Sequence, residues 1–144
     1  MTRFFLGTDT GSTKSHAILA DEQGHALGFG TGGPGNPQGI GFENLRRLLD
    51  DLTTQATTQA GVTRDQIAGV GFGIAGYDWP SQKPKFRDTV APLGLKCPVE
   101  FANDASVGLL AGATEGWGVA VVSGTSCNCR GRDRRGREGR VTGH

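Results

Sequence analysis

The sequence has few cysteines, few aromatic residues and no long hydrophobic run. Three of its 144 residues are cysteines, and aromatic residues account for 7%. Three cysteines cannot build the disulfide framework of a small secreted domain, and the first residues lack the basic and apolar segments of a secretion signal. No apolar stretch approaches the roughly 20 residues that span a bilayer. These features predict a soluble, cytoplasmic protein with no membrane partner.

Charge is distributed unevenly, although the net charge is only +1. Residues 130–140 (RGRDRRGREGR) hold six arginines and two acidic residues, whereas the rest of the chain holds nine basic and twelve acidic residues. An arginine-rich arm that binds RNA is one interpretation of such a block. Charge blocks are more often a solvated hairpin or a loose chain end, so we expect no nucleic-acid partner.

Three short runs near the N-terminus predict strands. They cover residues 4–8, 15–20 and 25–30, and small turns separate them. The turn at residues 21–24 (DEQG) has the composition of a β-hairpin, so the three runs should form an antiparallel meander. Residues 32–41 (GGPGNPQGIG) contain five glycines and two prolines, which predicts a loop.

The following segments alternate between helix and strand patterns. The clearest helix covers residues 42–60 and ends at Gly61. The other elements are a strand at 67–74, a weaker helix at 82–93 interrupted by Pro84, a strand at 99–102, a helix at 105–113 that Asp104 could begin, and a strand at 118–123. Right-handed crossovers after a meander predict an α/β fold with a mixed five-stranded sheet and helices on both faces, as in ribonuclease H-like domains.

The loop of residues 9–15 (DTGSTKS) joins two predicted strands. It is not a P-loop, because it contains no GK dipeptide. Its backbone N–H groups and hydroxyls could face an anion, and Asp9 could orient a hydrated Mg²⁺ ion. The alternative is a plain hairpin in which the polar side chains only cap turns.

A second loop, residues 123–128 (SGTSCN), repeats this chemistry after another buried strand, so the two loops could grip one polyphosphate. Phosphoryl transfer also needs a carboxylate that accepts the proton of the attacking hydroxyl. Asp104 is the best candidate, because it lies between a strand end and a helix start, where the helix dipole should keep it ionised. An N-cap role is the alternative for Asp104, and the two roles can coexist.

Four motifs in chain order carry a resemblance to a known family. They are DTGSTKS, GGPGN, FANDA and VVSGTSCNCRGR. Together they resemble the N-acetylglucosamine kinases and the wider BadF/BadG/BcrA/BcrD ATPases, which belong to the sugar kinase, Hsp70 and actin superfamily. In that superfamily two ribonuclease H-like domains close on ATP and Mg²⁺. The resemblance therefore implies both of these as cofactors.

The resemblance also implies roles for individual residues. ATP would be bound by Asp9, Gly11, Ser12, Thr13, Lys14, Gly124 and Thr125, and an amino sugar by Asn36, Asp104, Cys127 and Asn128. Asp104 would be the catalytic base and Asp9 would hold the metal. The sequence departs from the kinases at Ser126-Cys127, where they usually have Gly-Ser, so the resemblance does not define fine substrate choice.

By the same resemblance the chain corresponds to the N-terminal half of such a kinase. Residues 1–117 would form the first domain, and residues 118–144 would be the first strands of a second domain. The implied activity is ATP-dependent phosphorylation of N-acetylglucosamine or a related amino sugar. An ATPase that activates an electron-transfer partner and a non-catalytic nucleotide-binding module are the alternatives. Unpaired strand edges in residues 118–142 favour a homodimer.

Overall fold

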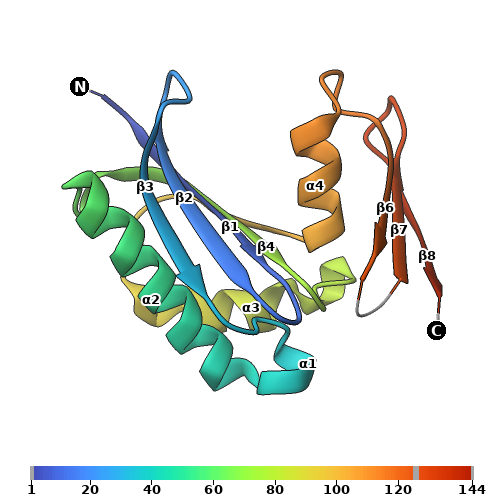
Figure 1. Cartoon of the computed structure of the whole chain (residues 1–144), viewed down its shortest axis with the longest axis horizontal. Helices are drawn as coiled ribbons and strands as arrows, with labels where there is room; N and C mark the ends of the chain where they lie inside the picture. The colour runs from blue at the N-terminus through green and yellow to red at the C-terminus, as the bar shows by residue number, and fades with distance from the viewer. Residues whose placement is uncertain (1, 125–126, 144) are drawn as a thin grey trace.

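A mixed five-stranded sheet is the main feature of the computed structural model, which describes residues 2–124 and 127–143. Its order is β3-β2-β1-β4-β5 (Figure 1). The strands are β1 (Phe4–Thr10), β2 (Ser15–Asp21), β3 (Ala26–Gly32), β4 (Ile67–Ile74) and β5 (Val99–Ala102). The first three are antiparallel neighbours, and β4 and β5 extend the sheet parallel to β1. The predicted meander and its parallel extension are confirmed.

One face of this sheet is covered by α2 (Phe42–Ala60), with the short α1 (Pro37–Ile40) before it (Figure 1). Leu45, Leu49 and Leu52 recur at helical spacing, and all three are fully buried against the sheet. The helix ends where expected, because Gly61 adopts a left-handed conformation with φ of 65° and donates to the carbonyls of the last turn. The main hydrophobic core therefore lies between α2 and the sheet.

Glycines in β3 allow α2 to lie unusually close to the sheet. A Cβ atom at Gly30 would lie 2.6 Å from the carbonyl oxygen of Leu52, and one at Gly28 would overlap the carbonyl oxygen of Ala56. Any side chain at these two positions would push the helix away. The glycines of this strand thus reflect close packing between backbones.

The segment predicted as one weak helix is divided into three pieces. A 3₁₀ turn, η2 (Pro80–Gln82), precedes α3 (Lys83–Val90), and a second 3₁₀ turn, η3 (Ala91–Leu93), follows it. Pro84 lies in the first turn of α3 and does not interrupt it, because a helix makes no use of backbone N–H groups there. A third 3₁₀ turn, η1 (Arg64–Gln66), leads into β4.

α4 (Asp104–Gly112) packs on the opposite face of the sheet, where it contacts β1 and β4. The predicted arrangement with helices on both faces is therefore confirmed. α4 also separates the large sheet from a second, three-stranded antiparallel sheet (Figure 1). That sheet contains β6 (Gly118–Ser123), β7 (Cys127–Arg132) and β8 (Glu138–Gly143), in this order.

The arginine block forms the hairpin between β7 and β8. Asp133 holds its turn, because its carboxylate accepts hydrogen bonds from the backbone N–H groups of Arg135 and Arg137, both at 2.9 Å. The hairpin expectation is confirmed, but the block is not solvated throughout. Arg130 is only 6% exposed, and the reason lies in the partners described below.

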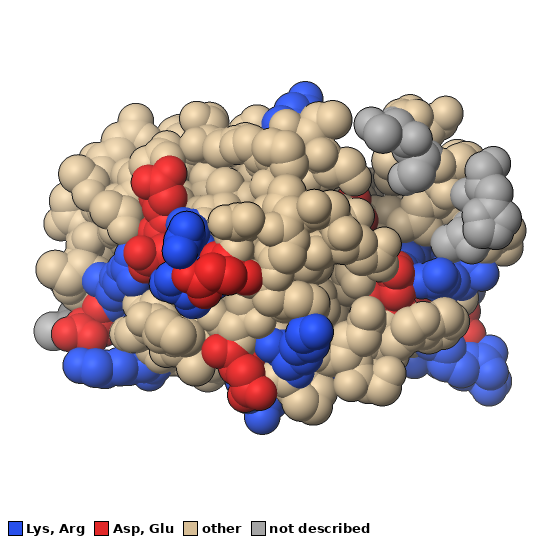
Figure 2. Space-filling model, turned by 90° about the horizontal axis from the view of Figure 1, so that it is seen from below, with Lys and Arg blue, Asp and Glu red and all other residues tan. Residues whose placement is uncertain are grey.

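On the face shown in Figure 2, acidic and basic side chains lie next to one another in a few clusters, and other residues form most of the surface. Ion pairs form on helix surfaces, such as Glu43 with Arg46 at 2.6 Å. These contacts lower the pKa of Glu43 to about 2. In the described part of the chain, no helix combines the length and the hydropathy needed to cross a membrane.

Candidate active site

The loop after β1 is braced by the glycine-rich segment that follows β3. The backbone N–H of Gly11 donates to the carbonyl of Lys14 at 2.9 Å, and the N–H of Gly35 donates to the carbonyl of Gly11 at 2.8 Å. The Ser15 hydroxyl donates to the carbonyl of Gly33, also at 2.8 Å. The loop therefore has a fixed shape, as a loop that binds an anion requires.

Asp104 is the first residue of α4, and Asn103 is the N-cap. The Asn103 side chain accepts a hydrogen bond from the N–H of Ala105 at 3.1 Å, which satisfies one of the free donors at the helix start. The N-cap alternative for Asp104 is therefore wrong. The division of roles leaves the Asp104 carboxylate available for chemistry.

Asp104 lies between two cavities. The larger one, of about 590 Å³, runs between α4 and β6, and Asp9 and Asp104 lie at one end of it. The smaller one, of about 180 Å³, is lined by Ser12, Asn36, Gln38, Ala75, Gly76, Asp78, Asn103, Asp104, Val122, Cys127 and Asn128. Asp104 therefore lines both cavities. It shares the larger one with Asp9 and the smaller one with polar residues from several separate segments of the chain.

The structure brings all four predicted substrate residues together and distributes the predicted ATP residues more widely. Asn36, Asp104, Cys127 and Asn128 all line the smaller cavity, and so does Ser12, which was expected at the nucleotide. Gly11, Thr13, Lys14 and Gly124 are not among the residues that line either cavity. Thr125 lies outside the described residues.

Asn36 is held rigidly at the edge of the smaller cavity. It caps α1 through a hydrogen bond from the N–H of Gln38 to its side-chain oxygen, at 2.9 Å. Gly76 lies directly against it with φ of 87°, and a Cβ atom there would be 2.7 Å from the Asn36 oxygen. With the oxygen engaged, the amide nitrogen is the group of Asn36 suited to donate to a ligand.

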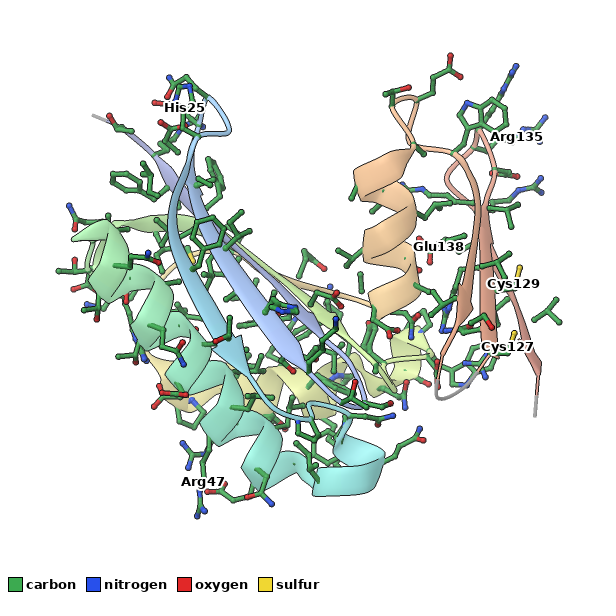
Figure 3. All side chains as sticks on the ribbon, in the orientation of Figure 1. His25, Arg47, Cys127, Cys129, Arg135 and Glu138 are labelled. Carbon is green, nitrogen blue, oxygen red and sulfur yellow. The ribbon has the colours of Figure 1, made fainter. Side chains whose placement is uncertain are left out.

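Asn128 and the two cysteines of β7 point in opposite directions. The amide nitrogen of Asn128 donates to the side-chain oxygen of Asn103 at 3.1 Å. The Asn128 oxygen is buried and accepts no hydrogen bond from the described residues, so it suits a ligand hydroxyl. In Figure 3 the sulfur atoms of Cys127 and Cys129 lie on the side of the second sheet that faces away from α4. Cys127 therefore lines the cavity through its backbone.

Burial raises the pKa of Asp104, and the nearby negative charge of Asp9 raises it further. The N–H of Ala105 and the positive charge of Arg130 act in the opposite direction, but they do not cancel the rise. The expectation that the helix dipole keeps this carboxylate ionised left out burial, which is the largest effect on the pKa of Asp104 and raises it. A carboxylate with a raised pKa is a better proton acceptor.

The carboxylate of Asp9 suits a hard cation such as Mg²⁺. It is exposed and opens into the larger cavity, where its like charge is felt at Asp104. Among the described residues, no group of three or more acidic, histidine or cysteine side chains could enclose a metal ion. Mg²⁺ commonly uses one or two carboxylates together with phosphate oxygens and water, and this donor set fits that pattern.

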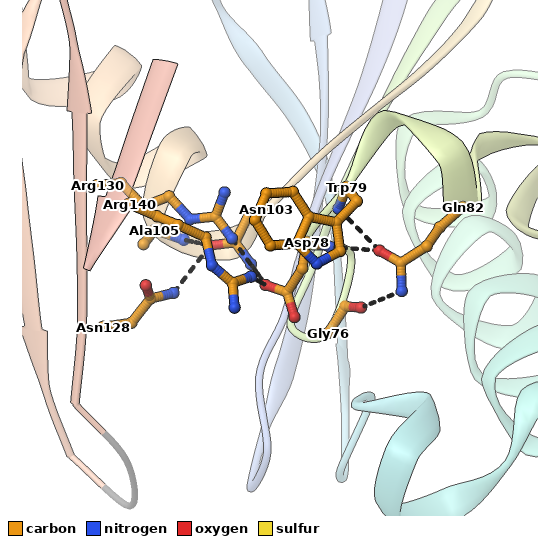
Figure 4. Close-up of polar contacts among 9 residues, drawn as sticks. All are labelled: Gly76, Asp78, Trp79, Gln82, Asn103, Ala105, Asn128, Arg130 and Arg140. Carbon is orange, nitrogen blue, oxygen red and sulfur yellow. Dashed lines mark hydrogen bonds and ion pairs between the residues drawn. The ribbon is translucent and has the colours of Figure 1, made fainter. Parts of the chain in front are cut away.

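Sequence reasoning did not identify an ion-pair cluster beside the smaller cavity (Figure 4). Asp78 forms ion pairs with Arg130 and Arg140, both at 2.7 Å, and Arg140 also lies over the ring of Trp79 at 4.5 Å. No sequence signal identifies this cluster, because Arg130 and Arg140 become neighbours only through the register of the hairpin, which the arginine-rich segment does not predict.

A sequence profile decides the family of this chain. The profile of the BadF/BadG/BcrA/BcrD ATPase family matches residues 6–144, which is nearly the whole chain. The chain belongs to the BadF/BadG/BcrA/BcrD ATPase family. This membership confirms the resemblance inferred from the four motifs.

Curated relatives of this family member include kinases of amino sugars. An N-acetylmuramic acid/N-acetylglucosamine kinase of Clostridium acetobutylicum is 28% identical over 98% of this chain and 46% of its own length. An N-acetyl-D-glucosamine kinase of Dictyostelium discoideum is 26% identical over 96% of the chain and, again, 46% of its own length. The chain thus spans about half the length of the curated relatives it matches.

Solved structures agree with the fold of this BadF/BadG/BcrA/BcrD ATPase. A putative N-acetylglucosamine kinase from Chromobacterium violaceum superposes with a TM-score of 0.77 at 20% identity, over 96% of this chain and 48% of the other. A glucokinase of the ROK family from Streptomyces griseus, solved with glucose and AMPPNP, superposes with a TM-score of 0.66 at 23% identity. This match covers 96% of this chain and 48% of the glucokinase. At these identities the likeness shows the actin-like α/β fold.

Proposed function

We propose that the protein transfers the γ-phosphoryl group of ATP to a hydroxyl group of N-acetylglucosamine or a related amino sugar. The observation that carries this proposal is the position of Asp104 between the two cavities. A carboxylate at such a boundary can accept a proton from an acceptor in the smaller cavity while a phosphoryl donor occupies the larger one. The curated relatives named as amino-sugar kinases support the same reaction.

The smaller cavity suits the acceptor sugar. Asn36 offers an amide donor and Asn128 a buried carbonyl acceptor, and these are the complementary groups that hydroxyl and acetamido substituents need. Asp104 accepts the hydroxyl proton as the oxygen attacks phosphorus, and its raised pKa favours this transfer. The residues thus bind the acceptor, orient it and remove its proton.

The larger cavity suits the phosphate groups of ATP. Asp9 would hold Mg²⁺ there, and the ion would neutralise charge that develops on the phosphoryl oxygens during transfer. The braced loop of residues 11–14 follows Asp9 directly but does not line this cavity, and the N–H of Gly11 already donates to Lys14, so only its remaining backbone N–H groups would be free to reach a phosphate chain that extends beyond Asp9. The Gly124 loop would approach from the second sheet.

Substitution of Asp104 by asparagine tests the proposal in the full-length protein. Asp104→Asn should lower kcat for ATP-dependent phosphorylation of N-acetylglucosamine by about 10²–10⁴-fold, because the general base is lost. Nucleotide affinity, measured by calorimetry, should change little. Asp133→Asn removes a carboxylate from the hairpin turn and is the matched control, with turnover unchanged.

Other outcomes would point to other functions. Wild-type turnover of ATP that does not depend on any sugar, and that survives Asp104→Asn, would contradict the kinase and favour an ATPase that drives a partner. Nucleotide binding without turnover would favour a non-catalytic module. A panel of amino sugars in the same assay identifies the acceptor, and Asn36→Ala should raise KM for that sugar while leaving KM for ATP nearly unchanged.

A further inference from the structure

Three elements distant in the sequence meet at the carboxylate of Asp78. Arg130 of β7 donates through Nη2 to Asp78 Oδ1 at 2.7 Å, and Arg140 of β8 approaches the same oxygen at 2.7 Å (Figure 4). Asn103 adds a longer contact of 3.5 Å from its amide nitrogen. This cluster is the direct polar link between the loop after β4 and the inner face of the second sheet.

The loop that carries Asp78 is itself fixed. The side-chain oxygen of Gln82 accepts hydrogen bonds from the backbone N–H groups of Asp78 and Trp79, at 2.7 and 2.8 Å. The amide nitrogen of Gln82 donates to the carbonyl of Gly76 at 3.4 Å. Asp78 therefore has a fixed position in the loop after β4, and Arg130 and Arg140 of the second sheet form ion pairs with it.

The cluster is connected to the residues of the smaller cavity. Arg130 is two positions from Asn128 on β7, so both side chains project from the same face of the strand. Asn128 in turn donates to Asn103, the residue that caps the helix beginning with Asp104. A shift of β7 would break this contact and separate Asn128 from Asp104.

We propose that Asp78 and Arg130 form a clamp that positions the sugar-binding Asn128 against Asp104. This inference rests on the proposed function for the identity of the ligand, although the clamp itself does not. Asp78 and Arg130 are positioning residues, since they act through β7. Arg140, stacked on Trp79, reinforces the clamp from the neighbouring strand.

Physical chemistry favours a positioning role over a purely stabilising one. Arg130 is 6% exposed, and its Nε atom is buried without a hydrogen-bond partner among the described residues. Removing a guanidinium from water costs free energy that an ion pair barely recovers, so a buried pair adds little net stability. Such pairs are best attested as devices that fix register or geometry, which is what this site needs.

The kinetic test separates positioning from folding. In the full-length protein, Asp78→Asn and Arg130→Gln should each raise KM for the amino sugar by about tenfold, the size expected for one lost hydrogen bond. KM for ATP should stay within about twofold of wild type, because the clamp lies on the acceptor side. The double variant should lose no more than Asp78→Asn alone, because Asp78→Asn already removes the ion pair with Arg130. Arg130→Lys keeps the charge and should recover part of the loss.

Hydrogen exchange gives a readout that needs no substrate. Asp78→Asn should speed amide exchange in residues 127–132 by about tenfold or more, while β1 and β4 stay protected. The matched control is Arg137→Gln, which breaks an exposed carboxylate–arginine pair of 2.7 Å in the turn of the same hairpin and leaves the two backbone hydrogen bonds to Asp133 in place. It should change neither the sugar KM nor the exchange of residues 127–132.

The outcomes are distinguishable. Unchanged sugar KM and unchanged exchange in both single variants would overturn the clamp. Equal losses in sugar and ATP kinetics, or additive losses in the double variant, would also overturn it and leave a general structural role. A wild-type protein that phosphorylates no amino sugar would overturn the proposed function and the sugar-positioning role, and the exchange arm would still decide whether Asp78 holds β7.

Discussion

Asp104 illustrates a conflict between folding and catalysis at a single residue. Its pKa is raised in the folded protein, so ionisation opposes folding and stability falls as the pH rises through the folded-state pKa. Asp104→Asn removes a charge that is partly desolvated. We therefore expect this variant to unfold at a slightly higher temperature than wild type at pH 7, while turnover is lost.

The pH dependence checks that explanation. Below the ordinary pKa of an aspartate the wild-type carboxyl is protonated in both states, so the advantage of Asp104→Asn should disappear near pH 3. Thermal unfolding followed by circular dichroism at both pH values measures the difference. Asp133 has a lowered pKa because Arg137 and its neighbours hydrogen-bond to it, so Asp133→Asn should have the opposite sign at pH 7. If Asp104→Asn unfolded at a lower temperature than wild type at pH 7, the proposed cost of burying the Asp104 charge would be contradicted.

Single residues also mark the limit of what the sequence could predict about the site. The family resemblance named Asn36, Asp104 and Asn128 as sugar-binding residues, and all three line the smaller cavity. Asp78 and Arg130 were not identified, because their roles depend on a contact across 52 positions of sequence. No local pattern distinguishes a buried arginine from the solvated ones beside it.

At the level of elements, α2 packs closely on β3 because positions 28 and 30 of that strand are glycines, which have no side chain. Gly30→Ala places a methyl group 2.6 Å from the Leu52 carbonyl, so the helix must move and the variant should lose about 1–3 kcal/mol of unfolding free energy. Urea denaturation measures the loss.

Gly71→Ala in β4 is the matched control. Among the described residues, nothing lies within 4 Å of a Cβ atom at Gly71, so this variant should stay within about 0.5 kcal/mol of wild type. Equal losses at Gly30 and Gly71 would show that strand glycines matter here for reasons other than close packing.

Periodicity predicted most elements well. The 42–60 helix and the strands at 67–74 and 99–102 have the predicted bounds, because apolar spacing and glycine boundaries are strong local signals. The segment around Pro84 was less well predicted, since 3₁₀ turns and a short helix share one weak pattern. Periodicity indicated the second sheet only at β6, because glycine and arginine carry little strand signal in β7 and β8, and the further strands in residues 118–144 were expected from the family resemblance.

On the scale of the whole molecule, the outer face of the second sheet is apolar and open. Val119, Val121 and Val141 are 69%, 68% and 72% exposed. We expect the 144-residue chain to self-associate through this face at micromolar concentrations, because β6 and β8 also present free edges. Light scattering after size-exclusion chromatography measures the mass.

Substitution of the exposed valines tests which surface is responsible. Val121→Thr combined with Val141→Thr should shift the chain toward monomer. Ile18→Thr, at a 42% exposed position on the five-stranded sheet, is the control and should leave the distribution unchanged. A chain that is already monomeric at about 100 μM would contradict the expectation.

The pairing of Arg130 with Arg140 has a consequence for how this hairpin can evolve. Side chains alternate along a strand, so the loss or gain of one residue within β7 or β8 would move side chains of that strand to the opposite face. Cys129 in β7 or Val141 in β8 would then face Asp78, and Arg130 or Arg140 would face outward. Length variation inside these strands should therefore be tolerated only in steps of two, and natural insertions should be confined to the turn at residues 133–136.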